Sequence, residues 1–292
     1  MTSSQSDNYY LNMHFPQERA LFALKDATLE RCIFTQGESP LKHGKNLELK
    51  QCHFEWKYPL WYTTNIDIDH SSFADTARSG FWYVDTLHMA DSTMAAPKGF
   101  RRSRHVRFDH VSFQHAQETL WTCSDIVLND CQINGEYFAK DSDHIRISNC
   151  KIAGNYAFDG ASDIEITDST ILAKDCFWNC KNVKVKNSVI IGEYLAWNTE
   201  NIVFENCVIR SLQGLNYTDQ LVMRNCTMLD SRDVFEYSTL DADIHGHIDS
   251  ILNPTSGYID VDSVGEITLD QQYIDPEQVH INVRNTEEGL VR

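Results

Sequence analysis

The chain has 292 residues, with 42 acidic against 25 basic side chains and a formal net charge of −17. This negative field repels a nucleic-acid backbone or an anionic membrane surface, so we expect neither as a partner. The first ten residues lack the basic and apolar segments of a signal peptide, and no apolar run approaches the roughly 20 residues of a membrane span. We therefore expect a cytoplasmic protein.

Small residues recur with a period near 20 along most of the chain, and we call them the anchors. They are Cys32, Cys52, Ser71, Ser92, Val111, Cys131, Cys150, Ser169, Ser188, Cys207 and Cys226. A fixed period of this length indicates a solenoid, in which one structural unit is stacked repeatedly. No Pro/Gly/Ser-rich linker interrupts the repeat, so we expect a single domain over residues 1–292.

The amino-terminal residues 1–24 are expected to cover the open end of this stack. Within them, the segment Phe15–Phe22 predicts a short capping helix, because the edge of a first coil needs a cover. Residues 25–240 then form the coils.

Each unit of the coils opens with alternating apolar residues, such as Leu47 and Leu49, or Ile66 and Ile68. Period two with one apolar face predicts a half-buried strand, and no segment with a 3.6-residue period interrupts the units. A second apolar position follows each anchor by two residues, as at Phe54. We therefore predict an all-β fold, a single-stranded parallel β-helix of about eleven coils.

Residues 241–292 break the period and are expected to form a C-terminal β cap and tail around the turn Asn253–Gly257. One strand of this cap places five potential metal ligands on one face: Asp241, Asp243, His245, His247 and Asp249. Such a face can hold a metal, but it is more often the solvated side of a closing strand. We predict no metal and no other cofactor, and metal binding by His245 and His247 is left open.

Six of the nine cysteines are anchors, where they interchange with Ser and Val. That interchange indicates a small buried site that points inward, so we expect free thiols rather than disulfides. Cys176 and Cys180 lack the spacing and the partners of a zinc site and are expected to be structural.

A second column of residues stands ten positions before the anchors, and we call it the stripe. It consists of Lys42, Trp61, Trp82, Arg101, Trp121, Lys140, Asp159, Trp178, Trp197 and Asn216, and it holds five of the six tryptophans. A column that mixes Trp with charged residues is expected outside the core. Aromatic rings repeated at about 4.8 Å per coil suit the apolar faces of sugars. The stripe is therefore either a binding surface or a stack that only stabilises the solenoid.

Candidate roles follow from the chemistry of the side chains along the stripe. For hydrolysis, Asp159 pairs with Glu136 or Asp141 on the adjacent coil, or with Glu118 two coils away. For elimination, Lys140 serves as the base and Arg101 neutralises a substrate carboxylate. We assign substrate binding to Trp61, Trp82, Trp121, Trp178, Trp197, Arg102, Asn179 and Asn198. Lys174, Asp175 and Glu193 lie beside the stripe without an assigned role.

Several short segments of the sequence resemble those of a known group of proteins. They are Gly37–Lys42, Trp56–Tyr62, Ala96–Arg102, Glu118–Trp121, Gly135–Phe138, Lys174–Asn179, Gly192–Asn198 and Phe235–Tyr237. With them the chain resembles the pectin-lyase-like superfamily of right-handed parallel β-helices, and specifically a bacterial family catalogued as a domain of unknown function. The resemblance implies a right-handed coil and brings no assigned activity. The calcium-binding aspartates of pectate lyases and the paired aspartates of polygalacturonases have no counterparts here.

Three functions remain open at this stage. The first is an intracellular carbohydrate-related enzyme, a lyase or a hydrolase, acting on a soluble oligosaccharide or sugar acid. The second is a non-catalytic binder of a glycan or a metabolite. The third is a scaffold or homo-oligomer whose stripe forms a protein interface, because Trp and Arg are common interface anchors.

Overall fold

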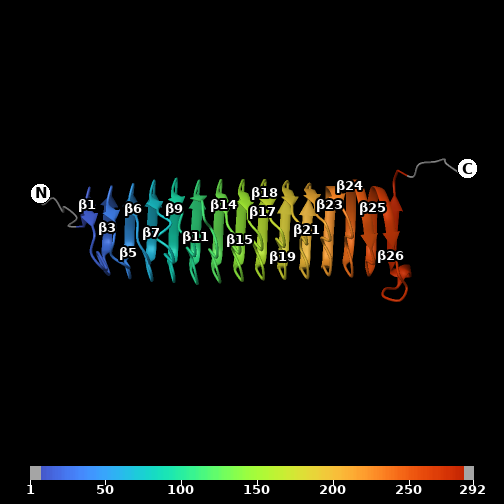
Figure 1. Cartoon of the computed structure of the whole chain (residues 1–292), viewed down its shortest axis with the longest axis horizontal. Coiled ribbons are helices and arrows are strands. Elements are labelled where there is room, and N and C mark those ends of the chain that lie inside the picture. The colour runs from blue at the N-terminus through green and yellow to red at the C-terminus, as the bar shows by residue number, and fades with distance from the viewer. Residues whose placement is uncertain (1–7, 286–292) are drawn as a thin grey trace, which may run out of the picture. The chain divides into compact units, whose positions relative to one another are not determined.

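The computed structural model describes residues 8–285. Residues 1–7 and 286–292, the extreme ends of the predicted N-terminal cap and C-terminal tail, lie outside this range. The described elements are 26 β-strands and one 3-10 helix, η1, at Pro276–Gln278. The chain forms two compact units, Met1–Lys151 and Ile152–Arg292. In each unit the strands follow one another in chain order, as the colours and labels of Figure 1 show. Within residues 8–285, no helix is long and apolar enough to cross a membrane.

In the first unit, a long strand and a short strand alternate along the chain, and equivalent strands of successive coils pair in parallel. The register places Leu47 beside Ile66 and Leu49 beside Ile68, as the alternating pattern requires. The strands are β1 (Tyr9–Leu11), β2 (His14–Phe15), β3 (Lys25–Glu30), β4 (Ile33–Phe34), β5 (Lys45–Lys50), β6 (His53–Phe54), β7 (Thr64–Asp69), β8 (Ser72–Phe73), β9 (Asp85–Ala90), β10 (Thr93–Met94), β11 (Arg104–Asp109), β12 (Ser112–Phe113), β13 (Ser124–Asn129), β14 (Gln132–Asn134) and β15 (Asp143–Ser148).

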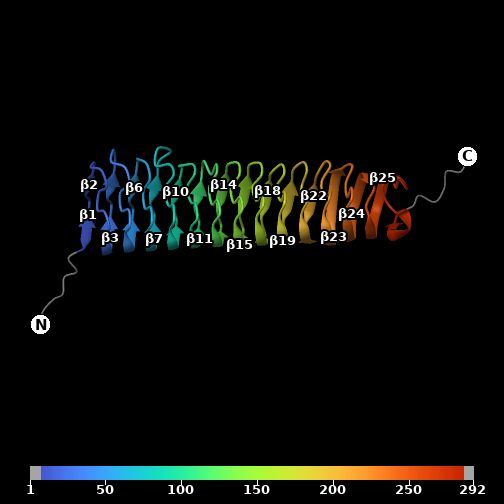
Figure 2. The same ribbon diagram turned by 90° about the horizontal axis from the view of Figure 1, so that it is seen from below.

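The second unit continues the same pattern after β16 (Lys151–Ala153), which contains the boundary between the units. Its strands lengthen toward the carboxyl end, where β23, β24 and β25 have 13 or 14 residues each (Figure 2). The strands are β17 (Ser162–Thr167), β18 (Thr170–Leu172), β19 (Lys181–Lys186), β20 (Val189–Ile191), β21 (Glu200–Glu205), β22 (Val208–Arg210), β23 (Asp219–Ser231), β24 (Thr239–Leu252), β25 (Ser256–Thr268) and β26 (Val279–Val283). The protein is thus an all-β parallel solenoid of the right-handed type.

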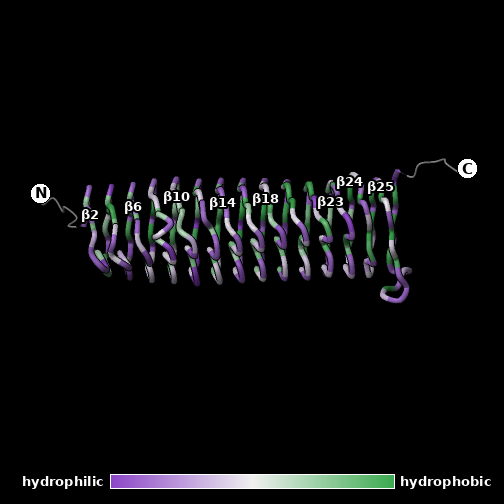
Figure 3. Tube along the Cα trace, in the orientation of Figure 1, coloured by the Kyte–Doolittle hydropathy of each residue, from purple (hydrophilic) through white to green (hydrophobic). Residues whose placement is uncertain are grey.

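The anchors and the apolar strand residues form the core of each unit, and the coloured trace shows this alternation of apolar and polar segments in every coil (Figure 3). In the first unit, Phe15, Phe34, Phe54 and Phe73 stack in one row with ring centroids 4.6 to 4.9 Å apart. Full burial of each such side chain contributes about 1.5–3 kcal/mol. All nine cysteines are buried and free, as the interchange with Ser predicts.

The predicted capping helix at Phe15–Phe22 is wrong. Phe15 ends strand β2, and Arg19 and Leu21 have positive φ values of 51° and 53°. Such alternating left-handed residues cannot belong to a right-handed helix. The Arg19 amide instead donates to the Glu38 carbonyl of the next coil at 2.9 Å. The segment is therefore an ordinary corner of the first coil.

The predicted number of coils is also too low, since the two units together contain about 14. The additional coils lie where the anchor changes its identity. The anchor Cys226 pairs with Ile244, and Ile244 pairs with Val261. Larger apolar residues therefore take the anchor position in the coils after Cys226. Thr239 and Ser256 pair although they are only 17 residues apart, because the coil becomes shorter there. Strands β24 and β25 consequently continue the parallel stack.

Candidate functional site

In the first unit, the side chains of the stripe cover one another. The rings of Trp61 and Trp82 are stacked at 5.0 Å with an angle of 8°, and Lys42 Nζ lies 5.3 Å from the Trp61 ring. The guanidinium of Arg101 lies between Trp82 and Trp121, at 5.0 and 4.5 Å from their ring centroids. Stacking of a sugar needs an open ring face. Trp61 and Trp82 offer edges rather than faces, because neighbouring side chains take both sides of each ring.

The charged residues of this part of the stripe are paired with one another. Arg101 donates to Glu118 Oε2 at 2.6 Å, and Lys98 Nζ lies 3.2 Å from the same oxygen. Arg102 is exposed and donates to the Tyr83 hydroxyl at 3.3 Å. Arg101, which the sequence analysis assigns to a substrate carboxylate, is therefore already paired with the carboxylate of Glu118.

The tryptophans of the stripe share a hydrogen bond that ties each indole to the next coil. The N–H groups of Trp61, Trp82, Trp121 and Trp197 donate to the carbonyls of Ser79, Lys98, Tyr137 and Gln213, respectively.

Trp178 departs from this pattern. Among residues 8–285 its N–H has no hydrogen-bond acceptor, and the atom reaches the surface rather than being buried. Its ring stacks on Tyr156 at 5.8 Å instead. An indole N–H at this position is therefore available to a ligand.

Asp175 lies in the same coil as Trp178, within the second unit. It is only 3% exposed, and its Oδ2 is a buried oxygen without a hydrogen-bond partner in the described part of the chain. Burial raises the pKa of Asp175 above its ordinary value, and the nearby Glu193 and Asp159 charges add to this effect. Lys174 and a hydrogen bond with the Tyr156 side chain act in the opposite direction and lower this pKa. Buried carboxyls with raised pKa values are concentrated at functional sites.

Aromatic and amide side chains lie in the same coil as this carboxyl and in the neighbouring coils. The Tyr194 ring lies 5.6 Å from Trp197, and Trp197 lies 5.2 Å from Tyr217. We call the group the Asp175 cluster: Tyr156, Asp159, Lys174, Asp175, Trp178, Asn179, Glu193, Tyr194, Trp197, Asn198 and Tyr217.

The backbone positions these residues at a corner of the coil. Asp175 and Asn179 have left-handed φ values of 53° and 57° and stand on either side of Trp178. The Asn198 amide donates to Asn179 Oδ1 at 2.8 Å, and the Asn179 amide donates to Asp159 Oδ1 at 3.3 Å. Beside this chain of amides lies an open depression of about 400 Å³, lined in part by Asn179, Asn198 and Tyr217.

The structure brings only some of the predicted site residues together. Asp159, Trp178, Trp197, Asn179 and Asn198 gather in the second unit with Asp175. The other predicted residues belong to the first unit: Trp61, Trp82, Arg101, Arg102, Glu118, Trp121, Glu136, Lys140 and Asp141.

Within the first unit, Glu136 and Asp141 are exposed and Lys140 is half-buried. Their proposed pairing with Asp159 as acids and base stays a prediction.

Sequence reasoning placed Asp175 beside the stripe but assigned it no role, and it overlooked Tyr156 and Tyr194. These three residues stand thirteen positions before successive anchors. An acidic residue between two tyrosines at this repeated position is a sequence pattern that could have identified the site.

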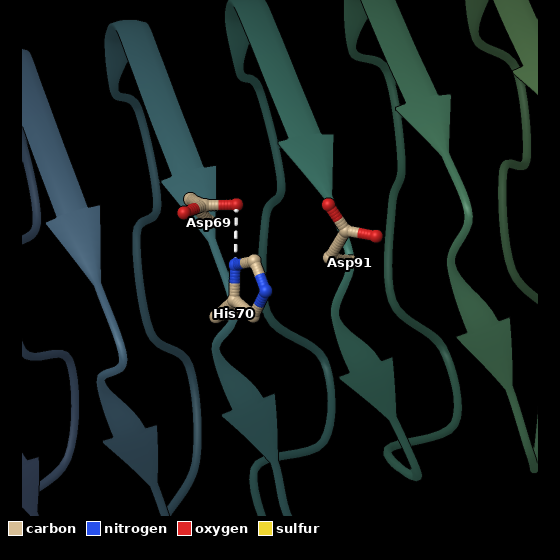
Figure 4. Close-up of side chains that lie close together, drawn as sticks. All are labelled: Asp69, His70 and Asp91. Carbon is tan, nitrogen blue, oxygen red and sulfur yellow. Dashed lines mark hydrogen bonds and ion pairs between the residues drawn. The ribbon is translucent and has the colours of Figure 1, made fainter.

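The one group of potential metal ligands that converges among residues 8–285 is Asp69, His70 and Asp91, whose ligand atoms lie within 4.8 Å of one another (Figure 4). His70 Nδ1 contacts Asp69 Oδ1 at 2.8 Å, and both His70 and Asp91 are exposed.

The predicted histidine face of β24 has other contacts. His245 lies 3.5 Å from Asp262, and His247 contacts Ser263 Oγ at 2.8 Å.

The family described as "Protein of unknown function (DUF3737)" matches residues 8–282. No curated protein matches the chain. Among solved structures, a mutant of DFA-IIIase from Arthrobacter chlorophenolicus A6 is 10% identical, with 90% of this chain and 77% of that chain covered and a TM-score of 0.36. QnrB1, a plasmid-mediated fluoroquinolone resistance protein, is 8% identical, with 76% and 92% covered and a TM-score of 0.19. Neither similarity bears on the activity of this chain.

Proposed function

We propose a function for this chain, which belongs to the DUF3737 family, from the geometry of its second unit: it binds a soluble carbohydrate at the Asp175 cluster. The observation that carries the proposal is the buried Asp175 oxygen without a partner, in the same corner of the coil as Trp178, whose N–H makes no hydrogen bond within the described residues. A buried polar atom left unpaired costs about 1–3 kcal/mol, so a ligand that satisfies it gains binding energy.

The composition of the cluster supports a sugar as this ligand. Carbohydrates present apolar ring faces together with many hydroxyl groups, so they are bound by aromatic rings combined with amides and carboxylates. The cluster supplies these groups from four successive coils, with the amides of Asn179 and Asn198 linked to Asp159. Coils rise by about 4.8 Å, which is close to the length of one sugar unit.

Tryptophan fluorescence during titration with neutral, acidic and amino oligosaccharides tests this proposal. We expect at least one class to change the emission with saturation, and Trp178→Phe to weaken its binding by about tenfold, which corresponds to about 1.4 kcal/mol. Trp56→Phe is the matched control, because Trp56 lies outside the stripe and contacts Lys57. Lack of saturable binding by every class, or an unchanged affinity in Trp178→Phe, would contradict the proposal.

A second candidate function is cleavage of the bound glycoside. It is favoured by the raised pKa of Asp175 beside a second acid, Asp159, since glycoside hydrolysis uses one protonated and one ionised carboxyl. Release of reducing ends that is lost in Asp175→Asn would identify this activity. Binding without release would leave the protein a carbohydrate binder.

A further inference from the structure

Two residues of the second unit occupy the same places in their coils as the Arg101–Glu118 ion pair of the first unit. Asp159 corresponds to Arg101, and Asp175 corresponds to Glu118. Arg101 and Asp159 both stand ten positions before an anchor. Glu118 and Asp175 both stand thirteen positions before the next anchor along the chain. A tryptophan of the stripe follows in each case, Trp121 in the first unit and Trp178 in the second.

In the first unit the carboxylate of this arrangement is paired, while Nε of Arg101 is buried without a hydrogen-bond partner in the described residues. The Arg101 side chain is 24% exposed. Its guanidinium lies over Trp121 and forms an ion pair with Glu118. Lys98, thirteen positions before the preceding anchor, gives the same carboxylate a second cation. A carboxylate with two cations and an aromatic face is well satisfied.

In the second unit the carboxylate remains, both of these cations are replaced, and the Tyr156 side chain gives the carboxyl a hydrogen bond instead. Tyr156 stands where the first unit has Lys98, and Asp159 stands where it has Arg101. Oδ2 of Asp175 has no hydrogen-bond partner in the described residues. The second unit therefore has the carboxylate and the tryptophan of a cation site, with an acid at the position of the cation.

We propose that the ligand supplies this cation: the carbohydrate bound at the Asp175 cluster is an amino sugar, whose ammonium group takes the place that Arg101 occupies in the first unit. This inference rests on the proposed function and names its substrate class. The ammonium lies between the carboxyls of Asp159 and Asp175, beside the stacked rings of Tyr156 and Trp178, and the sugar extends along Trp197 and the amides of Asn179 and Asn198.

The same cluster already holds one ammonium in this manner. Lys174 Nζ lies 4.9 Å from the Tyr194 ring centroid and 3.5 Å from Glu193. Lys42 repeats the contact over Trp61 in the first unit. An aromatic face with a nearby carboxylate is a common recognition site for ammonium groups.

The charges of the cluster disfavour an acidic sugar. The cluster has three acidic residues, Asp159, Asp175 and Glu193. Its one basic residue is Lys174, which is paired with Glu193. A uronic acid carboxylate needs a planar guanidinium fork, and none of the residues of the cluster is arginine. The inference therefore favours an amino sugar, and the sugar acid considered from sequence alone stays a prediction.

Entry of the ligand requires one side chain to move, because Oδ2 of Asp175 is covered. Trp178 is free of the indole-to-carbonyl bond that holds the other four tryptophans of the stripe. Rotation of this ring breaks no hydrogen bond of the indole. An ammonium bound there also keeps Asp175 ionised, so amino-sugar binding and acid catalysis by Asp175 exclude each other in one complex.

Calorimetry with a fully deacetylated glucosamine tetramer and with its N-acetylated counterpart, at pH 6 and low salt, tests the inference. The two probes differ only in the charge and the acetyl group at nitrogen. We expect the deacetylated tetramer to bind at least tenfold more tightly and to lose that preference in Asp159→Asn. Asp163→Asn is the matched control, since Asp163 is an exposed acid of the same unit that accepts a hydrogen bond from Asn182. Thermal unfolding verifies that both variants fold.

The outcomes separate this inference from the proposed function. Equal or tighter binding of the N-acetylated tetramer, sensitive to Trp178→Phe, overturns the amino sugar and leaves carbohydrate binding in place. Failure of every oligosaccharide to bind overturns both. Spermidine binding as tightly as the deacetylated tetramer shows that the ammonium is recognised without the sugar, which also overturns the inference.

Discussion

Asp159→Arg is expected to stabilise the second unit by on the order of 2 kcal/mol at pH 7 and to abolish ligand binding. The substitution places a guanidinium at the position equivalent to Arg101, beside the Asp175 carboxylate and the stacked rings of Tyr156 and Trp178. A hydrogen bond to a charged group contributes about 1.5–3 kcal/mol, and a partly desolvated cation–π contact adds about 0.5–2 kcal/mol. Some of this gain is offset by the ordering of a long side chain.

The stabilisation by Asp159→Arg should depend on pH in a defined direction. In the native protein the pKa of Asp175 is raised, so its contribution to stability is present below the unfolded pKa and is lost as the pH rises through the folded pKa. In the variant the guanidinium lowers this pKa, so the contribution is present above the unfolded pKa. The difference between the two proteins should therefore increase from pH 4 to pH 7.

Urea unfolding at a series of pH values measures this difference. Asp163→Arg serves as the control, because the same charge change at an exposed position should alter the free energy of unfolding by less than about 1 kcal/mol. A destabilised Asp159→Arg variant at pH 7, or a difference that shrinks as the pH rises, would show that the Asp175 site does not accept a cation.

Arg101→Asp is expected to destabilise the first unit by about 1.5–3 kcal/mol, because it removes a charged hydrogen bond from a half-buried ion pair while Lys98 stays beside Glu118. Glu118 then faces a second acid, and the facing rings of Trp82 and Trp121 lose the guanidinium between them. The change places an acid at the stripe position, as in the second unit, while Lys98 remains paired with Glu118.

The control for this prediction is Arg104→Asp, which breaks an exposed pair. Arg104 contacts Asp85 at 2.6 Å, but its side chain is 62% exposed, so the loss should stay near 1 kcal/mol. Urea unfolding measures the free energy of unfolding of both variants, and we expect the larger loss in Arg101→Asp. Similar free energies of unfolding would refute a special role for the Arg101 sandwich.

The period of the sequence was sufficient to predict the parallel β-solenoid. Anchors such as Cys131 and Cys150 mark the inside of each coil, and their spacing sets the register of every strand. The prediction failed at the two ends, where other residues replace the anchor. At Ile244 the inward residue becomes large and the coil shortens, so neither the residue type nor the spacing reveals the repeat.

The candidate site was only partly predictable for a different reason. The stripe was visible because tryptophan is rare, yet its composition does not show which rings are covered. Trp82 and Trp178 look equivalent in the sequence, but Trp82 lies between Trp61 and Arg101, whereas Trp178 stacks on a tyrosine of another column. Asp175 was overlooked as a site residue because an acid at a corner is ordinarily solvated, and its burial depends on neighbouring coils.

Carbon-13 NMR titration of the Asp175 carboxyl in the ligand-free protein tests the central claim most directly, because it reports whether a cation is missing at this position. We predict a pKa above the ordinary 3.8, and a decrease when the deacetylated glucosamine tetramer binds. A pKa at or below 3.8 in the free protein would contradict the account, since it would mean that the protein itself already supplies the charge that Asp175 requires.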